Sequence, residues 1–242
     1  MLLSEQNFQT IDQDLTTRGQ AILATNLCKS VGEAPDKIDI LTNLQLQVAL
    51  GESVAIVGSS GSGKSTLLGL LAGLDNPTSG SVTVQGAAFS DLDEDARAAV
   101  RGKQMGFVFQ SFQLLPTMTA LENVMLPMQL ANQSNAKQIA IATLEKVGLG
   151  ARLSHYPKQL SGGEQQRVAI ARAFAPQPAI LFADEPTGNL DLATGERIID
   201  LLFSLNQAAG KTLILVTHDV KLAQRCQRTL TLNNGQLSEV GL

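Results

Sequence analysis

The stretch Gly58-Ser59-Ser60-Gly61-Ser62-Gly63-Lys64-Ser65-Thr66 decides the fold class of this 242-residue chain. It matches the pattern G-x-x-x-x-G-K-[ST], in which consecutive backbone N–H groups of a glycine-permitted turn surround phosphate oxygens. The match follows an apolar strand-like run, Val54–Val57, and precedes a helical stretch that begins at Ser65. A chance match is on the order of one in a hundred for ordinary glycine usage. The segment is therefore interpreted as a phosphate-binding loop.

Each side chain at the end of this loop has an expected task. Lys64 is expected to reach the β- and γ-phosphates of a nucleotide, and the hydroxyl of Ser65 to ligate Mg²⁺. The helix that follows adds the positive end of its dipole to the same site. The loop thus predicts a nucleoside triphosphate and Mg²⁺ as ligands.

Composition narrows the class of protein further. Hydrophobic residues make up 44% and charged residues 17%, as in a globular domain, and the net charge of −4 disfavours nucleic acid as a partner. Cys28 and Cys226 are too few for a disulfide framework and are interpreted as small buried hydrophobes. No apolar run approaches the roughly 20 residues of a membrane span, and the N-terminus lacks the pattern of a signal peptide. We therefore expect a cytosolic protein, unless a membrane partner holds it at a surface.

Hydrophobic patterning predicts an α/β core with two additions. Residues 1–20 are polar and aperiodic, and are expected to form a flexible tail before one domain at 21–242. From Ala21 to Asp91 strands dominate, and Ile38–Leu50 alternates as a half-buried antiparallel strand does. The stretch of about 96–160 is expected to be an inserted, mostly helical subdomain. From Ser161 onward helices alternate with buried strands, which predicts a parallel sheet.

Two buried strands in the last third of the chain carry polar residues at their ends. Asp184 and Glu185 follow Ala179–Ala183, and we expect Asp184 to hold the Mg²⁺ shell and Glu185 to act as general base. His218 follows the strand Thr212–Val216 and is a candidate contact to the γ-phosphate. His155, by contrast, is interpreted as an ordinary packed or surface residue. Further on, Asn234-Gly235 predicts a tight hairpin.

A second anion site is expected at the start of a later helix. Leu160 is followed by Ser161-Gly162-Gly163-Glu164, which forms the Ser-x-x-Glu pattern of a capping box. The two glycines leave backbone N–H groups accessible at a helix N-terminus. Two phosphate-binding ends in one chain suggest a site that closes between two copies.

At this point the chain resembles a known superfamily. Leu160-Ser161-Gly162-Gly163-Glu164-Gln165-Gln166-Arg167 is similar to the signature sequence of ABC ATPases. The resemblance implies a P-loop NTPase (RecA-like) core with an antiparallel β subdomain and an inserted helical subdomain. It also implies ATP hydrolysis and a head-to-tail dimer with a second copy, in which each signature faces the partner's phosphate loop.

Other motifs follow in the order of that superfamily. Gln110 resembles the loop glutamine that touches Mg²⁺ and signals to the membrane partner. Asn189 and Asp191 resemble the segment that communicates across the dimer, and His218 resembles the switch histidine. The resemblance covers the chain from about residue 21.

Finer features resemble one group of ABC ATP-binding subunits. Gly106–Val124 and Asp184–Asp191 are similar to the group that contains LolD, MacB and FtsE, and Leu201–Asn206 is closest to the YbbA type. This resemblance implies an integral membrane permease of the YbbP type as partner, and a place on the cytoplasmic face of the inner membrane. It implies mechanotransmission, which acts on lipids, lipoproteins or hydrophobic compounds.

One position departs from the family pattern. ABC ATPases usually stack adenine on an aromatic residue upstream of the phosphate loop, and by spacing that position falls near Ser30–Val31. The only tyrosine, Tyr156, lies far along the chain, and Phe8 is the only aromatic residue before Phe89. Either Val31 supplies an apolar contact or another residue does so.

Three hypotheses of function follow. The first is an ATPase subunit that powers a membrane permease. The second is a regulatory protein that changes its associations on binding ATP, and the presence of Glu185 and His218 disfavours it. The third is an ABC protein that acts on DNA or ribosomes. Two features of the chain disfavour it: its net negative charge, and a length of 242 residues, which is too short for two ATP modules or a long coiled coil.

Overall fold

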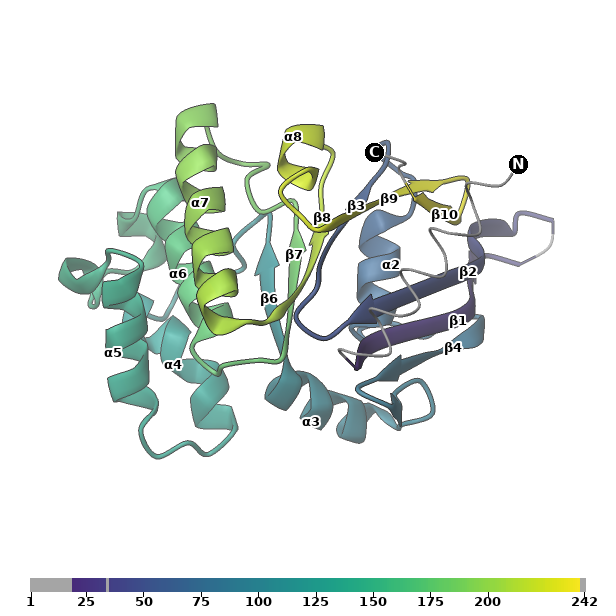
Figure 1. Ribbon diagram of the computed structural model, residues 1–242. Coiled ribbons are helices and arrows are strands. Elements are labelled where there is room, and N and C mark those ends of the chain that lie inside the picture. The colour runs from purple at the N-terminus through teal and green to yellow at the C-terminus, as the bar shows by residue number, and fades with distance from the viewer. Residues whose placement is uncertain (1–18, 34, 240–242) are drawn as a thin grey trace. The chain divides into compact units, whose positions relative to one another are not determined.

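The computed structural model describes residues 19–33 and 35–239 (Figure 1). Its internal contacts divide the chain into two compact units. Unit 1 joins the residues before Ala98 with those after Thr217, and unit 2 is Ala98–Thr217. The tail expected at 1–20 lies outside the described residues except for its last two positions.

Unit 1 contains an antiparallel sheet with the strand order β2-β1-β4-β5. The bounds are β1 Gln20–Val31, β2 Ile38–Ala49, β4 Ser79–Val84 and β5 Ala87–Ala88. Strand β2 buries Leu41, Leu44, Leu46 and Val48, while most positions between them are exposed or half-buried. The alternation seen in the sequence therefore gives an antiparallel strand with one face in the core, as expected.

A second group of strands in unit 1 carries the phosphate loop. Strand β3 (Ser53–Val57) runs parallel to β9 (Arg228–Asn233), which pairs antiparallel with β10 (Gln236–Glu239). Asn234 and Gly235 join β9 to β10 with φ of 46° and 74°, so the predicted tight hairpin is confirmed. Helix α2 (Lys64–Leu71) follows β3, and the short α8 (Val220–Ala223) precedes β9. The strand–loop–helix context of the phosphate loop is thus present.

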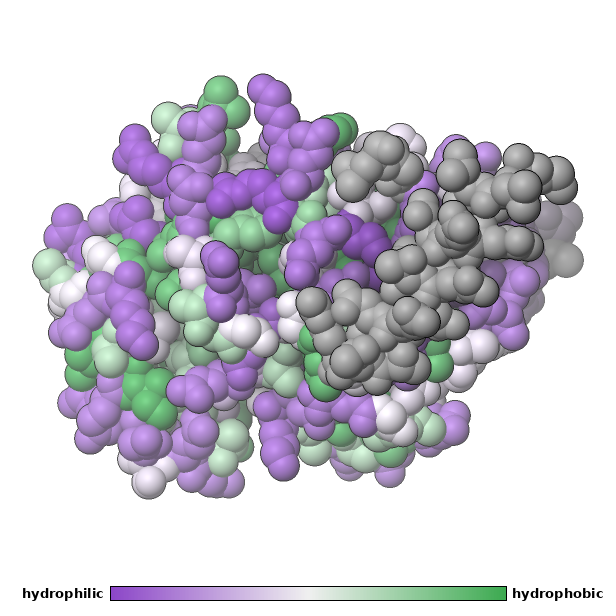
Figure 2. Space-filling model, viewed as in Figure 1, coloured by the Kyte–Doolittle hydropathy of each residue, from purple (hydrophilic) through white to green (hydrophobic). Residues whose placement is uncertain are grey.

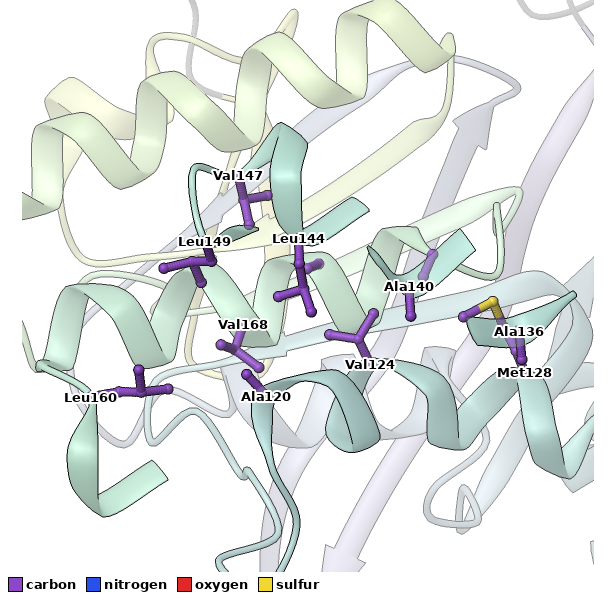
Figure 3. Close-up of a cluster of buried hydrophobic side chains, with 12 residues drawn as sticks. Ala120, Val124, Met128, Ala136, Ala140, Leu144, Val147, Leu149, Leu160 and Val168 are labelled. Carbon is purple, nitrogen blue, oxygen red and sulfur yellow. The ribbon is translucent and has the colours of Figure 1, made fainter. Parts of the chain in front are cut away.

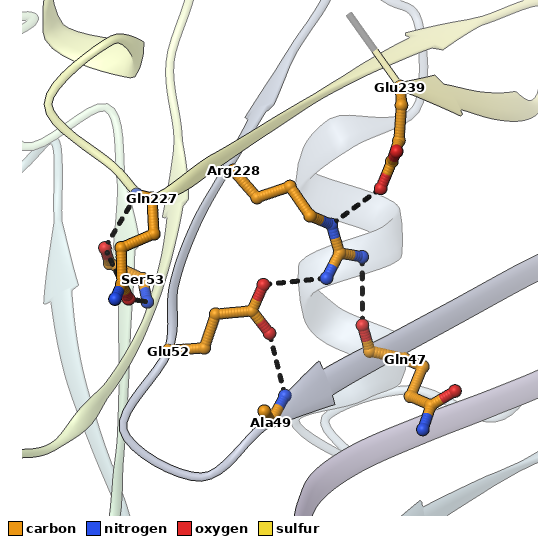
Figure 4. A network of polar contacts seen from close by, with 7 residues as sticks. All are labelled: Gln47, Ala49, Glu52, Ser53, Gln227, Arg228 and Glu239. Atoms are coloured by element: carbon orange, nitrogen blue, oxygen red, sulfur yellow. Dashed lines mark hydrogen bonds and ion pairs between the residues drawn. The ribbon is translucent and has the colours of Figure 1, made fainter. Parts of the chain in front are cut away.

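An arginine on β9 ties the beginning and the end of unit 1 together (Figure 4). Arg228 donates from Nη1 to Glu52 Oε1 at 2.7 Å and from Nη2 to the carbonyl of Gln47 at 3.0 Å, and pairs through Nε with Glu239 Oε1 at 3.0 Å. Glu52 also accepts from the backbone N–H of Ala49 at 2.8 Å. The side chains of Arg228 and Glu52 are only 19% and 11% exposed. This mostly buried ion pair therefore fixes the turn between β2 and β3 against β9.

Unit 2 is built on three parallel strands. Strand β7 (Ile180–Asp184) lies between β6 (Met105–Phe109) and β8 (Thr212–Val216), and β8 is buried along its whole length. Both β7 and β8 lie where the sequence predicted buried strands. Strand β6 lies within the stretch that was expected to be mostly helical, and the sequence patterns did not single it out. Its pairing with β7 makes it part of the parallel sheet.

Helices make up most of the rest of unit 2. They are α4 Ala120–Leu130, α5 Ala136–Lys146, α6 Gly162–Phe174 and α7 Leu192–Ala209, with 3₁₀ turns at Gly150–Arg152 and Pro157–Gln159, and α3 (Glu94–Gln104) crosses the division between units. Helices α4, α5 and α6 bury a common apolar cluster that includes Val124, Leu144 and Val168 (Figure 3). Apolar residues at i, i+3 and i+4 form this face, as the pattern of Ala140, Leu144 and Val147 predicted.

Both cysteines are free and of intermediate exposure, so they are less buried than the small buried hydrophobes that were expected. Cys28 Sγ accepts the N–H of Asn43 at 3.2 Å, because β1 and β2 bring the two residues together. Burial raises the pKa of the Cys226 thiol to about 12. A thiol with that pKa stays protonated at neutral pH and is unreactive.

On the face seen in Figure 2, hydrophilic residues are interspersed with small hydrophobic patches. Such mixing is usual for protein surfaces. None of the helices in the described ranges has the length and apolar character that crossing a membrane requires.

The ion pair of Arg228 generates the first prediction. Arg228→Ala leaves the mostly buried Glu52 carboxylate without its cation, so the free energy of unfolding in urea is expected to fall by about 2–4 kcal/mol. The double variant Glu52→Gln/Arg228→Met removes both charges and is expected to lose less. Equal losses in the two variants would show that the pairing of charges is not what stabilises this turn.

Candidate nucleotide site

Backbone geometry shapes the phosphate loop in unit 1. Gly63 stands at the N-cap of α2 with φ 96° and ψ 10°, a left-handed conformation that favours glycine. A Cβ on Gly58 would lie 2.5 Å from the carbonyl oxygen of Leu232 and 2.7 Å from Ser62 Oγ. No side chain fits at Gly58, so the loop keeps the open backbone that a phosphate group needs.

The side chain of Lys64 is hydrogen-bonded to the backbone of its own loop. Lys64 is 8% exposed, and its Nζ donates to the carbonyls of Gly58 at 3.0 Å and Ser59 at 2.9 Å. The hydroxyl of Ser62 is buried without a hydrogen-bond partner in the described part of the chain. Because a buried polar group without a partner is costly, this hydroxyl and the Lys64 ammonium both suit an anionic oxygen inside the loop.

Strand β7 in unit 2 presents the two acidic residues at its end. Asp184 is the last residue of β7 and pairs with Phe109 of β6 and Val216 of β8 in the parallel register. Glu185 follows with φ 46°, and its N–H donates to the carbonyl of Val216 at 2.9 Å. A left-handed, non-glycine backbone is uncommon, and it marks the junction of the strand end and the acidic pair as a constrained position.

The structure brings Gln110 and Asn189 together in unit 2. Asn189 Nδ2 donates to the carbonyl of Gln110 at 3.0 Å, and Gln110 Nε2 donates to Asn189 Oδ1 at 3.3 Å. The Gln110 side chain also lies against Gly188, where a Cβ would come within 2.6 Å of Nε2. The loop after β6 and the segment after β7 therefore form one local structure.

The predicted capping box at Ser161 is present. The Ser161 hydroxyl accepts the N–H of Glu164 at 3.3 Å, and Glu164 Oε2 accepts the N–H of Ser161 at 2.9 Å. The backbone N–H and hydroxyl of Ser161, with Arg152 next, lower the pKa of Glu164 to about 2. Gly162 and Gly163 occupy the first helical positions of α6, where N–H groups have no partner within the helix.

The remaining expected site residues lie near helix starts. Asp191 caps α7 by accepting the N–H of Thr194 at 3.0 Å, and hydrogen bonds from Thr194 lower the pKa of Asp191. His218 is exposed, follows the buried Thr217 and belongs to unit 1 with the phosphate loop. Unit 1 thus holds the loop and His218, and unit 2 holds Gln110, Asp184, Glu185, Asn189, Asp191 and the signature residues 161–164.

The position where an aromatic residue was expected is aliphatic and exposed. Val31 ends β1 and pairs directly with Ile38 at the start of β2, and the two residues are 44% and 63% exposed. Ile40 lies two residues after Ile38 on β2. A Cβ added to Gly63 would lie 3.0 Å from the Cγ2 of Ile40, so this side chain is next to the phosphate loop. Branched aliphatic side chains therefore extend from the phosphate loop toward the Val31–Ile38 pair in unit 1.

The sequence patterns missed two residues that bind the backbone of the expected site segments. Gln166 on α6 is fully buried, and its Nε2 donates to the carbonyls of Pro186 at 2.6 Å and Phe109 at 3.5 Å. Arg172 on the same helix binds the carbonyls of Phe112 and Gln113. A glutamine on the buried face of an amphipathic helix was a usable signal, because buried amides require partners. Nothing in the sequence identified the partners of Arg172.

The three residues expected to ligate Mg²⁺ are of types that this ion accepts, one in unit 1 and two in unit 2. Ser65, Gln110 and Asp184 offer hydroxyl, amide and carboxylate oxygens, and Mg²⁺ is usually held by one or two carboxylates together with phosphates. Within the described ranges no cluster of three or more His, Cys, Asp or Glu residues could hold a metal alone.

The fold and these motifs define a class of protein. A family model described as ABC transporter matches residues 41–188, which is more than half of the chain. The chain belongs to the ABC transporter family and is its ATP-binding, ATP-hydrolysing subunit.

Relatives and solved structures agree with this class. The chain is 59% identical over 216 residues to the ABC transporter ATP-binding protein YbbA of Escherichia coli (strain K12), which covers 88% of this chain and 95% of that protein. It is 51% identical over 216 residues to the lipoprotein-releasing system ATP-binding protein LolD of Pseudomonas syringae pv. tomato, with the same coverage. A dimeric post-hydrolysis structure of the ATP-binding cassette MJ0796 with ADP and Pi matches with TM-score 0.83 and 41% identity, over 91% of this chain and all of that one. The expected resemblance to the LolD/YbbA group and the P-loop NTPase fold are confirmed.

The capping box at Ser161 generates a prediction of pH dependence. The pKa of Glu164 is about 2 in the folded protein against an ordinary value of 4.5, so its charge stabilises the fold above about pH 4.5. The advantage of wild type over Glu164→Gln, about 1 kcal/mol at neutral pH, is expected to shrink as the pH falls from about 4.5 toward about 2. Urea unfolding of both proteins across this range measures it.

Helix α4 offers a matched control for this prediction. Thr119 and Glu122 form the same capping box, in which the backbone N–H and hydroxyl of Thr119 lower the pKa of Glu122. Glu122→Gln is expected to lose stability with the same sign of pH dependence. A deficit of Glu164→Gln that stays constant through acid pH would contradict a role for the Glu164 charge.

Proposed function

We propose that the chain pairs with a second copy of itself when it binds ATP and Mg²⁺, and that hydrolysis opens the pair to drive a membrane permease. One observation carries the proposal. Two helices, α2 and α6, have starts that contain glycines and offer backbone N–H groups that can bind phosphate oxygens. Helix α2 begins at Gly63, which has no side chain to cap it, and α6 begins with Gly162 and Gly163 inside a capping box. The dimeric structures of the related cassette MJ0796 support the pairing.

In this proposal the residues of the phosphate loop bind and orient the triphosphate. The loop runs through Gly58, Ser59, Ser60, Gly61, Ser62, Gly63, Lys64, Ser65 and Thr66, and its N–H groups and the Lys64 ammonium would contact the β- and γ-phosphates. Mg²⁺ would be held by Ser65, Gln110 and Asp184, and supplies positive charge to the phosphate oxygens when bound.

Two further residues would act on the water and the leaving phosphate. Glu185 would accept the proton of the attacking water as general base. His218 would contact the γ-phosphate from unit 1. Ser161, Gly162, Gly163 and Glu164 would complete the ATP site of the second copy, and Asn189 and Asp191 would communicate across the dimer.

The partner is proposed to be an integral membrane permease of the YbbP type, which would hold the chain at the cytoplasmic face of the inner membrane. The cargo class is proposed to be lipids, lipoproteins or hydrophobic compounds. Similarity to YbbA and to the lipoprotein-releasing LolD supports this choice.

Glu185→Gln tests the hydrolytic mechanism. Loss of a general base is expected to lower ATP turnover by about 100-fold or more while leaving ATP binding in place. The variant is therefore expected to accumulate an ATP-dependent dimer, seen as earlier elution from a size-exclusion column. Glu145→Gln, an exposed position on α5, is the matched control and is expected to behave as wild type.

Two outcomes would contradict this mechanism. Wild-type protein that turns over ATP no faster than Glu185→Gln would favour a regulatory protein over an ATPase motor. A variant that stays monomeric with ATP would contradict the site shared between two copies.

Extraction in mild detergent tests the membrane partner. The tagged full chain is expected to co-purify with an integral membrane protein, and that complex is expected to hydrolyse ATP faster than the chain alone. An untagged strain controls for adhesion to the resin. Persistent recovery with ribosomes in place of a membrane protein would refute the transport proposal.

A further inference from the structure

Two consecutive residues after the Gln110 loop have left-handed backbones. Phe112 has φ 60° and Gln113 has φ 48°, a region that non-glycine residues enter only when their surroundings hold them there. They stand two and three positions after Gln110 in unit 2. Whatever holds this pair therefore also sets the course of the Gln110 loop.

Their N–H groups donate to the carbonyls of Phe109 and Ser111, and the guanidinium of Arg172 is the side chain that binds their carbonyls. Its Nη1 donates to the carbonyl of Gln113 at 2.6 Å, and its Nη2 donates to the carbonyl of Phe112 at 2.9 Å. A planar guanidinium offers two donors in a fixed fork, which a lysine ammonium does not reproduce. Burial lowers the pKa of Arg172, but a guanidinium stays charged at neutral pH. Arg172 lies in the last turn of α6, the helix that begins with the signature residues.

The held segment touches the start of the same helix. A Cβ on Gly162 would lie 3.8 Å from Phe112 Cζ and 3.3 Å from Leu190 Cδ2, so the Phe112 ring and Leu190 lie beside the signature glycine. Leu190 follows Asn189, which is bonded to Gln110 at 3.0 Å and 3.3 Å. The Gln110 loop, the segment after β7 and the signature residues therefore meet around Phe112.

A second polar residue of α6, Gln166, binds the chain where β6 ends and just after β7. Gln166 binds the carbonyls of Phe109, one residue before Gln110, and Pro186, one residue after Glu185. Helix α6 therefore binds the chain on both sides of Gln110. Gln166 binds the carbonyl of Phe109 before it, and Arg172 binds the carbonyls of Phe112 and Gln113 after it.

We propose that Arg172 is a positioning residue for ATP hydrolysis, which keeps Phe112 and Gln113 left-handed and so fixes Gln110 relative to the signature residues. The proposal rests on the proposed roles of Gln110 and of residues 161–164. Loss of the guanidinium fork would allow the pair to relax to ordinary φ values, which moves Gln110 away from Asn189 and the Phe112 ring away from Gly162.

Glycine at position 113 provides the sharp test. Arg172→Lys keeps the positive charge but loses the fork, and Arg172→Ala removes both. Gly occupies the left-handed region without strain, so Arg172→Lys/Gln113→Gly removes the strain at one of the two positions and is expected to recover part of the native loop's protection. Arg172→Lys/Gln113→Ala is the matched control, because it removes the same exposed side chain without relieving the strain.

Three readouts separate positioning from folding. In Arg172→Lys, hydrogen–deuterium exchange of the peptide 106–118 is expected to rise. The Mg²⁺ concentration for half-maximal turnover is also expected to rise, by roughly tenfold, as for residues that orient a metal ligand. The KM for ATP is expected to change less than kcat, because the phosphate loop is intact. Thermal unfolding of each variant measures any general loss of structure. Arg101→Lys on α3 is the control for an Arg-to-Lys change elsewhere in the chain, and it is expected to behave as wild type.

Each outcome decides the proposal. Recovery of exchange protection and Mg²⁺ dependence by Gln113→Gly but not by Gln113→Ala supports it. Equal recovery by both substitutions, or unchanged exchange and Mg²⁺ dependence in Arg172→Lys and Arg172→Ala, overturns it. Failure of the proposed function is distinguishable, because wild-type protein would then show no turnover that depends on Glu185.

Discussion

The N–H groups at the starts of helices, which the helix itself leaves without partners, are the constraint that organises this protein. Side chains meet that requirement at α4, α6 and α7, where Thr119, Ser161 and Asp191 accept backbone N–H groups. Helix α2 begins at Gly63, which has no side chain, and its cap carries no side-chain hydrogen bond. The start of α5, at Asn135, also has no side-chain cap, but only α2 follows a glycine-rich loop with a lysine, and the proposed triphosphate would supply acceptors there.

Helix α6 shows how one element can join several parts of a reaction site. Its first turn presents Gly162 and Gly163, its middle holds Phe109 and Pro186 through Gln166, and its last turn holds Phe112 and Gln113 through Arg172. The apolar side of the helix packs in the cluster with α4 and α5. Helix α6 therefore connects the Gln110 loop, the segment after β7 and the signature residues within unit 2.

Local patterns predicted much of this structure, and long-range contacts set the limit. Strands β7 and β8, the Asn234-Gly235 hairpin and the Ser161 capping box depend on residues close in sequence, and all were predicted. Strand β6 was missed, because five residues inside a helical stretch show no period and their partner strand lies some 75 positions away. The partial exposure of Cys28 and the partners of Arg172 likewise depend on distant backbone. The roles of Glu185, His218 and the signature residues follow from motif order and stay predictions.

The Arg228 ion pairs make the end of the chain part of the support for its beginning. Glu239 on β10 binds Arg228, which also binds Glu52 and the Gln47 carbonyl at the turn that leads into β3 and the phosphate loop. A shortened protein that stops at Asn233 would keep every motif of the family and still lose part of the scaffold behind its nucleotide loop. For anyone who trims or fuses this protein, the safe boundary is set by Glu239 and lies well beyond the last recognisable motif.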